Sequence, residues 1–363
     1  MKNAFIVLIS LLLFISCKPK SENKSAETKK TSALTKGDIK KIDVHAHYQY
    51  SRDYIPDFFK EWNMQGVLVD VAKAEATGIG RAWENYMAHA KIEPNLFFLC
   101  SSLIGVGIDA PDYAKKEIER LEKEINQGAR MVKVWKNFGM VTKDNSGKFI
   151  QIDDVRLQPI WDFLAKKNIP VMSHIGEPVQ AWRPLDEPNN PHYGYYSRNP
   201  EYHAYKHPEI PSYETIISAR DNWITANPNL TMLCAHLGSM SHDVDMVTER
   251  LDKFPNMLVE CGARFGDLAG QDSEKIRDFF DTYQNRILFG SDYGTSTPQD
   301  SLSVSERDEE LKNLNTDYTR LWDYLSSNDS LEIRNQKTEG LQLPDRILTK
   351  VYYENAANLL KIN

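Results

Sequence analysis

The sequence predicts an α/β fold, a (β/α)8 TIM barrel with an aromatic-rich insertion after strand 5 and an extended segment after strand 8. Short apolar runs typical of buried strands recur along the chain, and amphipathic stretches at helical spacing separate them. No long hairpin pattern interrupts this alternation, which indicates a parallel sheet. The eight predicted strands are 41–47, 67–72, 96–103, 130–135, 170–175, 230–237, 256–263 and 286–292. The clearest predicted helices are 112–126 and 273–283.

The first residues predict an export signal that precedes the barrel. Met1 to Asn3 supply a positive charge, and Ala4 to Ile15 form an apolar run that is too short for a permanent membrane helix. We therefore expect residues 1–16 to be a signal peptide. The ending Ser16-Cys17 resembles a bacterial lipobox, with Cys17 as the lipidated first residue of the mature chain.

Residues 17–38 are expected to form a disordered tether, because they contain no aromatic residue and are rich in Lys, Ser, Thr and Glu. Six lysines against three acidic residues give this segment a net charge of +3, and with Lys2 set aside the remainder from Ile39 carries −11. A basic tether can lie against anionic lipid, whereas an acidic domain is a poor binder of nucleic acid. These features predict a lipid-anchored lipoprotein of a bacterial cell envelope, on the periplasmic or outer-membrane side, with residues 39–363 as its barrel domain.

The remaining cysteines stand inside strand-like runs, at Cys100, Cys234 and Cys261. An odd number at core positions favours buried thiols over a disulfide framework.

Potential metal ligands stand at the ends of the predicted strands. His45 and His47 end the first run, and His174, His236 and Asp292 end the fifth, sixth and eighth. Side chains alternate along a strand, so His45 and His47 point to the same side and can bind one ion together. One such histidine alone would be read as a hydrogen-bonded core residue, but five such residues on four strand ends that meet at the carboxyl end of a barrel favour a metal site.

Two segments are longer than ordinary loops. Between His174 and Tyr213 the chain holds six tyrosines from 193 to 213, and these fit either an aromatic lid over the metal or packing of the insertion on the barrel. Glu177 and Trp182 directly follow His174, which favours the lid and makes both residues candidates for substrate binding. The second segment, 294–343, contains a polar helix-like piece over 308–326.

Five motifs follow one another along the chain: Asp43-Val44-His45-Ala46-His47, Val171-Met172-Ser173-His174, Ala235-His236-Leu237-Gly238, Arg286-Ile287-Leu288-Phe289-Gly290-Ser291-Asp292 and Glu354-Asn355-Ala356-Ala357-Asn358-Leu359-Leu360. In these motifs the chain resembles the amidohydrolase superfamily over about residues 41–362. The branch that it resembles is the amidohydrolase-related (amidohydrolase 2) branch, which includes aminocarboxymuconate-semialdehyde decarboxylase, resorcylate decarboxylases and several lactonases.

The resemblance implies that His45, His47, His174 and Asp292 bind one divalent ion. His236 is then the catalytic histidine, unless a second metal is present and His236 becomes a ligand. Asp292 would contact both the metal and the attacking water, accepting a proton and later delivering it to the leaving group. Nitrogen-rich ligands with one carboxylate suit zinc.

Two basic residues fit more than one role. Lys133 points into the barrel if Val132 and Val134 pack on the helices, and it then either pairs with an inward carboxylate such as Glu260 or holds an anionic substrate. The resemblance adds a third role, because in other branches of the superfamily a lysine on this fourth strand is carbamylated and bridges two metals. Arg264 follows the seventh strand and either binds a substrate carboxylate or forms a salt bridge at the rim.

The sequence thus predicts a metal-dependent hydrolase that acts on a small organic amide, lactone or related carbonyl compound by metal-activated water. The alternative is a nonhydrolytic metal-dependent decarboxylase that uses the same ligands. A third interpretation is a lipoprotein that binds a ligand without turnover, and intact residues at all four metal positions argue against it. The expected partners are a small-molecule substrate and, through Cys17, a membrane, with a homo-oligomer as an open alternative.

Overall fold

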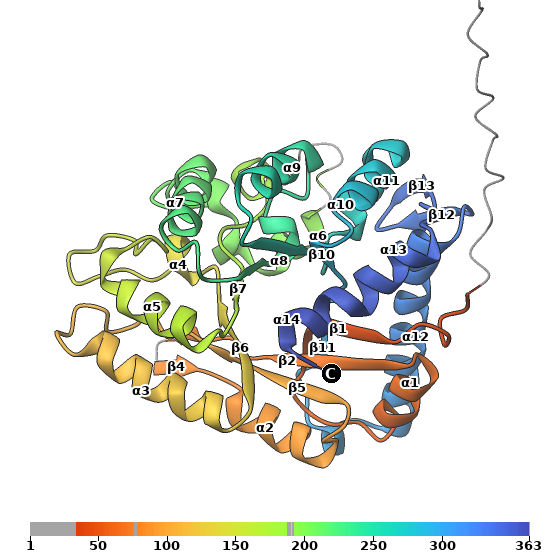
Figure 1. Ribbon diagram of the computed structural model, residues 1–363, viewed down its shortest axis with the longest axis horizontal. Coiled ribbons are helices and arrows are strands. Elements are labelled where there is room, and N and C mark those ends of the chain that lie inside the picture. Colours follow the sequence, from red (N-terminus) through yellow and green to blue (C-terminus); the bar gives the residue numbers. More distant parts are fainter. Residues whose placement is uncertain (1–33, 76–77, 187–189, 191, 363) are drawn as a thin grey trace, which may run out of the picture. The chain divides into compact units, whose positions relative to one another are not determined.

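The computed structural model describes residues 34–75, 78–186, 190 and 192–362, and its central feature is a parallel sheet flanked by helices (Figure 1). Every neighbouring pair of strands in this sheet runs parallel. The strands in spatial order are β10 (Ile287–Leu288), β9 (Met257–Glu260), β8 (Met232–Cys234), β7 (Val171–Ser173), β6 (Ala129–Val134), β5 (Phe97–Ser102), β2 (Met64–Val69), β1 (Lys41–Tyr48) and β11 (Tyr293–Thr295).

Backbone hydrogen bonds join the two ends of this sheet. The chain that follows β10 bonds to β1, since Val44 N donates to Phe289 O at 3.0 Å and Asp292 N donates to His45 O at 2.7 Å. The same chain continues as β11, which pairs with β1 from Ala46 onward. The predicted (β/α)8 barrel is therefore confirmed, and each of the eight predicted runs overlaps an observed strand.

Helices follow the strands as a barrel requires (Figure 1). The predicted helices over 112–126 and 273–283 are confirmed as α3 (Tyr113–Asn126) and α11 (Ser273–Thr282). Asp272 caps α11 by accepting from Lys275 N at 2.9 Å. The other helices around the barrel are α1 (Ile55–Glu61), α2 (Trp83–Ile92), α5 (Gln158–Lys167), α7 (Tyr213–Ala226), α9 (Val244–Lys253), α13 (Asp345–Thr349), the π-helical η6 (Lys350–Glu354) and α14 (Asn355–Leu360). Short elements on the connections are β3 (Lys73–Glu75), β4 (Gly78–Gly80), α4 (Asn137–Met140), η1 (Val155–Leu157), α8 (Ala235–Gly238) and α10 (Phe265–Ala269).

A shift of register in β1 sets the two histidines toward the interior. The pairing of β1 with β2 changes between Asp43 and Ala46, as at a β-bulge. Ile42 and Val44 belong to the apolar cluster inside the barrel, whereas Ala46 packs in the cluster between the strands and the helices. After the shift, His45 and His47 are the inward residues.

The insertion and the extended segment lie where the sequence predicts them. The insertion after β7 holds η2 (Val179–Trp182), α6 (Tyr193–Arg198), η3 (Pro200–Tyr202) and η4 (Ala204–Lys206). The segment after β11 holds η5 (Gln299–Ser301), α12 (Val304–Ser326) and the antiparallel hairpin of β12 (Ser330–Ile333) and β13 (Gln336–Glu339). The helix α12 packs on α1, because the ring of Tyr318 lies 5.4 Å from that of Phe58.

Residues 34–38, the described end of the predicted tether, lie against the barrel domain. Lys36 forms an ion pair with Glu61 at 2.6 Å, and its ammonium lies 4.4 Å from the ring of Trp62. These contacts with α1 and the residue that follows it hold residues 34–38 against the barrel domain. The predicted signal peptide, Cys17 and the rest of the tether lie outside the described residues.

Cys100, Cys234 and Cys261 are buried and unpaired, as expected. Within the described part of the chain, no helix has both the length and the apolar character needed to cross a membrane.

Candidate metal centre

The five predicted strand-end residues meet at the carboxyl end of the barrel. Oδ1 of Asp292 lies 3.4 Å from Nε2 of His45 and 3.2 Å from Nε2 of His47. One ligand atom from each of His45, His236 and Asp292 lies within 4.8 Å of the others. The ring of His174 lies 4.3 Å from that of His236, and its Nε2 is buried with no hydrogen-bond partner among the described residues.

Hydrogen bonds at the ring nitrogen Nδ1 orient three of these histidines. In each case Nδ1 faces an oxygen that can only accept, so Nδ1 carries the proton and Nε2 presents a lone pair. The pairs are His45 with Oε1 of Glu260 at 2.9 Å, His47 with the carbonyl of Val69 at 2.8 Å, and His236 with the carbonyl of Gly262 at 2.7 Å.

This arrangement leaves lone pairs facing one another. Nε2 of His47 and Oδ1 of Asp292 are both acceptors at 3.2 Å, and Nε2 of His45 stands 3.4 Å from the same oxygen. Such a cluster is unfavourable unless a proton or a cation lies between the groups. The donor set therefore fits a divalent metal ion.

The protonation states of the histidines and of Asp292 also fit a divalent metal ion. Burial first, and then the positive charges of neighbouring groups, lower the pKa of His45, and they lower the pKa of His174 and of His236 well below the ordinary value. Burial opposes ionisation of Asp292, but its interactions with His45, His47 and Lys133 outweigh this effect and lower its pKa. Neutral imidazoles and an ionised carboxylate are the forms that bind a metal.

Glu260, at the end of β9, holds the centre together. Its carboxylate accepts from Nδ1 of His45 at 2.9 Å, from the backbone N of His236 at 2.8 Å, and from the backbone N of Gly262. Gly290 leaves room for it, because a Cβ there would collide with Oε2 of Glu260 and lie 3.0 Å from Cβ of His45. Sequence reasoning assigned Glu260 only as a partner for Lys133 and missed this role.

Replacing Glu260 by glutamine is expected to weaken metal binding about 10–100-fold, the usual effect of losing a group that orients a ligand. The amide keeps the size of the side chain but turns a donor toward groups that themselves donate. Competition with a chelator that reports free metal would measure the affinity, with the exposed Glu274→Gln as the matched control. Equal metal affinity in both variants would contradict this role.

His236 reaches the centre through a left-handed turn. His236, Leu237, Gly238 and Ser239 all have positive φ, between 55° and 63°, so α8 is a left-handed turn and not a right-handed helix. Each non-glycine residue in this conformation costs about 1–2 kcal/mol. Hydrogen bonds offset the cost, and Ser239 alone donates to Gly176 O at 2.9 Å and accepts from Tyr213 at 3.0 Å.

Asp43 fixes the two strand ends that carry the ligands. Its buried carboxylate accepts from His45 N at 3.1 Å, from Ser291 N at 3.0 Å and from the hydroxyl of Tyr318 at 2.5 Å. Burial raises the pKa of Asp43 to about 6, and the hydrogen bonds oppose this shift. The sequence motif contains Asp43, but only the fold shows that it ties β1 to the end of the eighth strand.

Lys133 points into the barrel as predicted, because Val132 and Val134 pack toward the helices. Its Nζ lies 3.0 Å from Nε2 of His45, so its hydrogen-bond partner is this histidine and not Glu260. Burial lowers the pKa of Lys133 to about 8.

The predicted substrate-binding residues divide into two groups. Arg264 and Glu177 are buried and face each other, with Nη2 of Arg264 at 3.9 Å from Oε2 of Glu177. Trp182 instead donates to Pro211 O at 3.1 Å and packs on Tyr213. These contacts indicate that Trp182 packs the insertion on α7, and the described residues show no contact between it and the centre.

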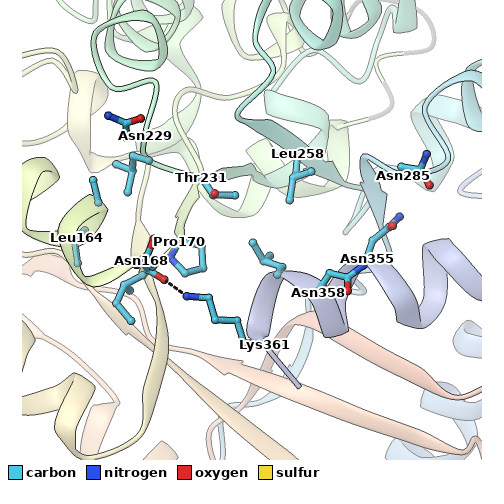
Figure 2. A pocket seen from close by; sticks show the side chains of 14 residues that line it. Leu164, Asn168, Pro170, Asn229, Thr231, Leu258, Asn285, Asn355, Asn358 and Lys361 are labelled. Atoms are coloured by element: carbon cyan, nitrogen blue, oxygen red, sulfur yellow. Dashed lines mark hydrogen bonds between the residues drawn. The ribbon is translucent and has the colours of Figure 1, made fainter. Parts of the chain in front are cut away.

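A cavity of about 440 Å³ opens beside His47 and provides space for a small molecule. It is lined by Gln49, Val71, Lys73, Gly80, Arg81, Ala82, Tyr86, Trp135 and Ser296 in addition to His47. A second pocket, shown in Figure 2, lies at the opposite end of the strands, where Pro170, Thr231 and Leu258 meet α14. Lys361 closes one side of that pocket by donating to the carbonyl of Asn168 at 3.1 Å (Figure 2).

A family model described as amidohydrolase matches residues 42–362. The chain belongs to the amidohydrolase family. The resemblance seen in the sequence motifs is thereby confirmed, and the family is one of metal-dependent enzymes. A search of curated proteins gives no significant match.

Solved structures with a similar fold include enzymes and one protein without an assigned activity. The 2,6-dihydroxybenzoate decarboxylase from Rhizobium is 14% identical, with a TM-score of 0.51 over 89% of this chain and 99% of that one. A dihydroxybenzoic acid decarboxylase from Polaromonas sp. JS666, solved with manganese and the inhibitor 2-nitroresorcinol, is 13% identical, with a TM-score of 0.50 over 90% and 98%. An uncharacterised TIM-barrel protein from Bordetella bronchiseptica is 17% identical, with a TM-score of 0.48 over 89% and 99%.

Proposed function

We propose that the protein is a metal-dependent hydrolase that cleaves a small organic amide, lactone or related carbonyl compound. The observation that supports this proposal is the convergence of Nε2 lone pairs from His45 and His47 on the carboxylate of Asp292, at 3.4 and 3.2 Å. His174 completes a nitrogen-rich set that suits one zinc ion, and His236 stands beside that set with its ring 4.3 Å from the ring of His174. The adjoining cavity of about 440 Å³ has the size of a small-molecule site.

The roles of the side chains follow from their protonation states. A divalent ion held by these residues would supply Lewis acidity at the substrate carbonyl. Asp292, kept ionised, accepts the proton of the attacking water and returns it to the leaving group. His236 carries its proton on Nδ1, toward Gly262, so its Nε2 aligns the water as an acceptor and is not the donor to a developing oxyanion.

Decarboxylation on the same residues is the second candidate function. Two buried cations, Lys136 and Arg264, stand beside the centre, and such charges favour a substrate that is an acid. The two decarboxylases with a similar fold are consistent with this alternative. Binding without turnover is a weaker explanation, because the complete set of ligand residues has no evident purpose without an open metal site.

The test of this proposal begins with metal analysis of the purified protein, for which we expect bound divalent metal. A panel of lactones, amides and aromatic acids then identifies the reaction. Base consumed at constant pH would report hydrolysis of a lactone, whereas released carbon dioxide would report decarboxylation. Absence of tightly bound metal under all loading conditions would refute both functions.

We also propose that Cys17 is lipidated after cleavage of residues 1–16. Acyl chains together with the basic tether provide the two signals that stable anchoring requires. A Cys17→Ala variant expressed in the native host is expected to move from the membrane fraction to the soluble fraction. Wild-type protein that is already soluble after fractionation would refute the anchor.

A further inference from the structure

A second charged cluster adjoins the metal centre, and it consists of Lys136, Glu177 and Arg264. Lys136 directly follows Trp135 after β6, and only 2% of its surface is exposed. Its ammonium forms an ion pair with Glu177 and lies 2.6 Å from the hydroxyl of Tyr195. Two polar groups of the insertion therefore contact Lys136, whose ammonium has three N–H donors.

Arg264, in contrast, has unused hydrogen-bonding capacity. It is 7% exposed, and a guanidinium offers five N–H donors. Nη1 donates to Ala263 O at 3.2 Å, Nη2 is 3.9 Å from Glu177, which is too long for a hydrogen bond, and Nε is buried without a partner among the described residues. Buried donors without acceptors are costly, so this side chain is arranged for a ligand that accepts.

The charges within the cluster are also unbalanced. Lys136 and Arg264 share one carboxylate, that of Glu177. Asp267 is near Arg264, but its oxygens accept from His192 at 3.1 Å and from Ser241 at 2.5 Å. The missing partner of Arg264 is an anion, and a planar carboxylate matches the fork of the guanidinium.

The position of the cluster connects it with the catalytic residues. Lys136 stands three residues after Lys133, and Glu177 stands three residues after His174, so the same strand ends carry the cluster and the centre. The ring of Tyr202 stands 3.7 Å from the Lys136 ammonium and 5.6 Å from the ring of Trp135, which lines the cavity beside His47. A molecule in this cavity can therefore extend an acidic group past Trp135 toward Lys136, which shares Glu177 with Arg264.

We propose that Arg264 and Lys136 form a carboxylate subsite and that the substrate is a small organic acid whose carboxylate binds there. The inference rests on the proposed function of the adjoining centre and narrows its substrate class. Glu177 acts as an internal competitor, since its carboxylate holds Lys136 and faces Arg264 when no substrate is bound. The tyrosines of the insertion, Tyr195 and Tyr202, form the wall of the subsite.

The experiment compares benzoate with its neutral counterpart benzamide by titration calorimetry on the metal-loaded protein. We expect benzoate to bind at least about tenfold more tightly than benzamide, because the guanidinium fork of Arg264 can form charge-assisted hydrogen bonds with a carboxylate. Arg264→Gln should remove most of this preference, and Arg183→Gln, an exposed arginine of the same insertion, should leave it unchanged. Glu177→Gln removes the internal competitor and should strengthen benzoate binding several-fold, an outcome that damage to the fold would not produce.

Two results would overturn the subsite. One is an equal affinity for benzoate and benzamide, and the other is a preference that survives Arg264→Gln, because the acid would then be bound by the metal alone. The titrations are repeated after removal of metal by a chelator, where the preference for benzoate is expected to persist. A different result would show that the proposed function fails while the subsite stands. In that case the protein would bind no metal but would still bind benzoate more tightly than benzamide.

Discussion

Alanine in place of His45 is expected to abolish both tight metal binding and turnover. The side chain supplies one Nε2 to the cluster, and its Nδ1 donates the orienting hydrogen bond to Glu260 at 2.9 Å. Its loss removes a ligand directly. Metal affinity should therefore fall by more than the factor of about 10–100 that is typical when a residue that only orients a ligand is replaced. Metal content after gel filtration and the activity of the same sample measure the two effects together.

The matched control is His207→Ala. This histidine lies in the insertion, where its Nε2 donates to Pro200 O at 3.1 Å and its Nδ1 lies 3.5 Å from Oε1 of Glu209. It should retain wild-type metal content and activity. If His45→Ala lost activity but kept a full complement of metal, His45 would be a substrate contact and the metal centre would have to be assigned without it.

The fold was predictable because its signals are local. Each buried strand leaves an apolar run such as 230–237, and the amphipathic pattern of 112–126 fixes a helix without knowledge of its neighbours. Strand ends were less accurate, since the run expected at 67–72 became β2 over Met64–Val69. The barrel places the carboxyl ends of all strands on one face, and that rule alone brought the five ligand candidates together.

The supporting residues of the site were less accessible to sequence reasoning. Glu260 serves His45 and the backbone of His236 at once, a relation across three strands that no spacing encodes. The left-handed turn at His236 depends on partners such as Glu260 and Tyr213 that are distant in sequence. Lys136 carried a signal that was overlooked, because it stands three residues after Lys133, just past the end of the same strand.

Lys133 presents the main physical problem of the centre. Its Nζ donates toward Nε2 of His45 at 3.0 Å, so the lone pair that a metal would use is already engaged. An ammonium beside a divalent ion is repelled by it. Burial lowers the pKa of Lys133 to about 8, which means that a modest further influence makes the amine neutral near physiological pH. Either Lys133 withdraws or loses its proton when one ion binds, or it is carbamylated and becomes a ligand to two ions.

Lys133→Met separates these arrangements, because they predict opposite changes. With one ion, the variant loses a competing cation and should bind metal at least about tenfold more tightly. His236→Asn should then keep near-normal metal content while turnover falls about 10²–10⁴-fold, the usual contribution of an aligned acid–base group. With two ions and a carbamylated lysine, wild type should contain two metals per chain, and either replacement should remove one of them. Metal stoichiometry and affinity in the wild type and both variants decide between the two without knowledge of the substrate. We expect the single-ion pattern, and two ions per wild-type chain would make His236 a ligand.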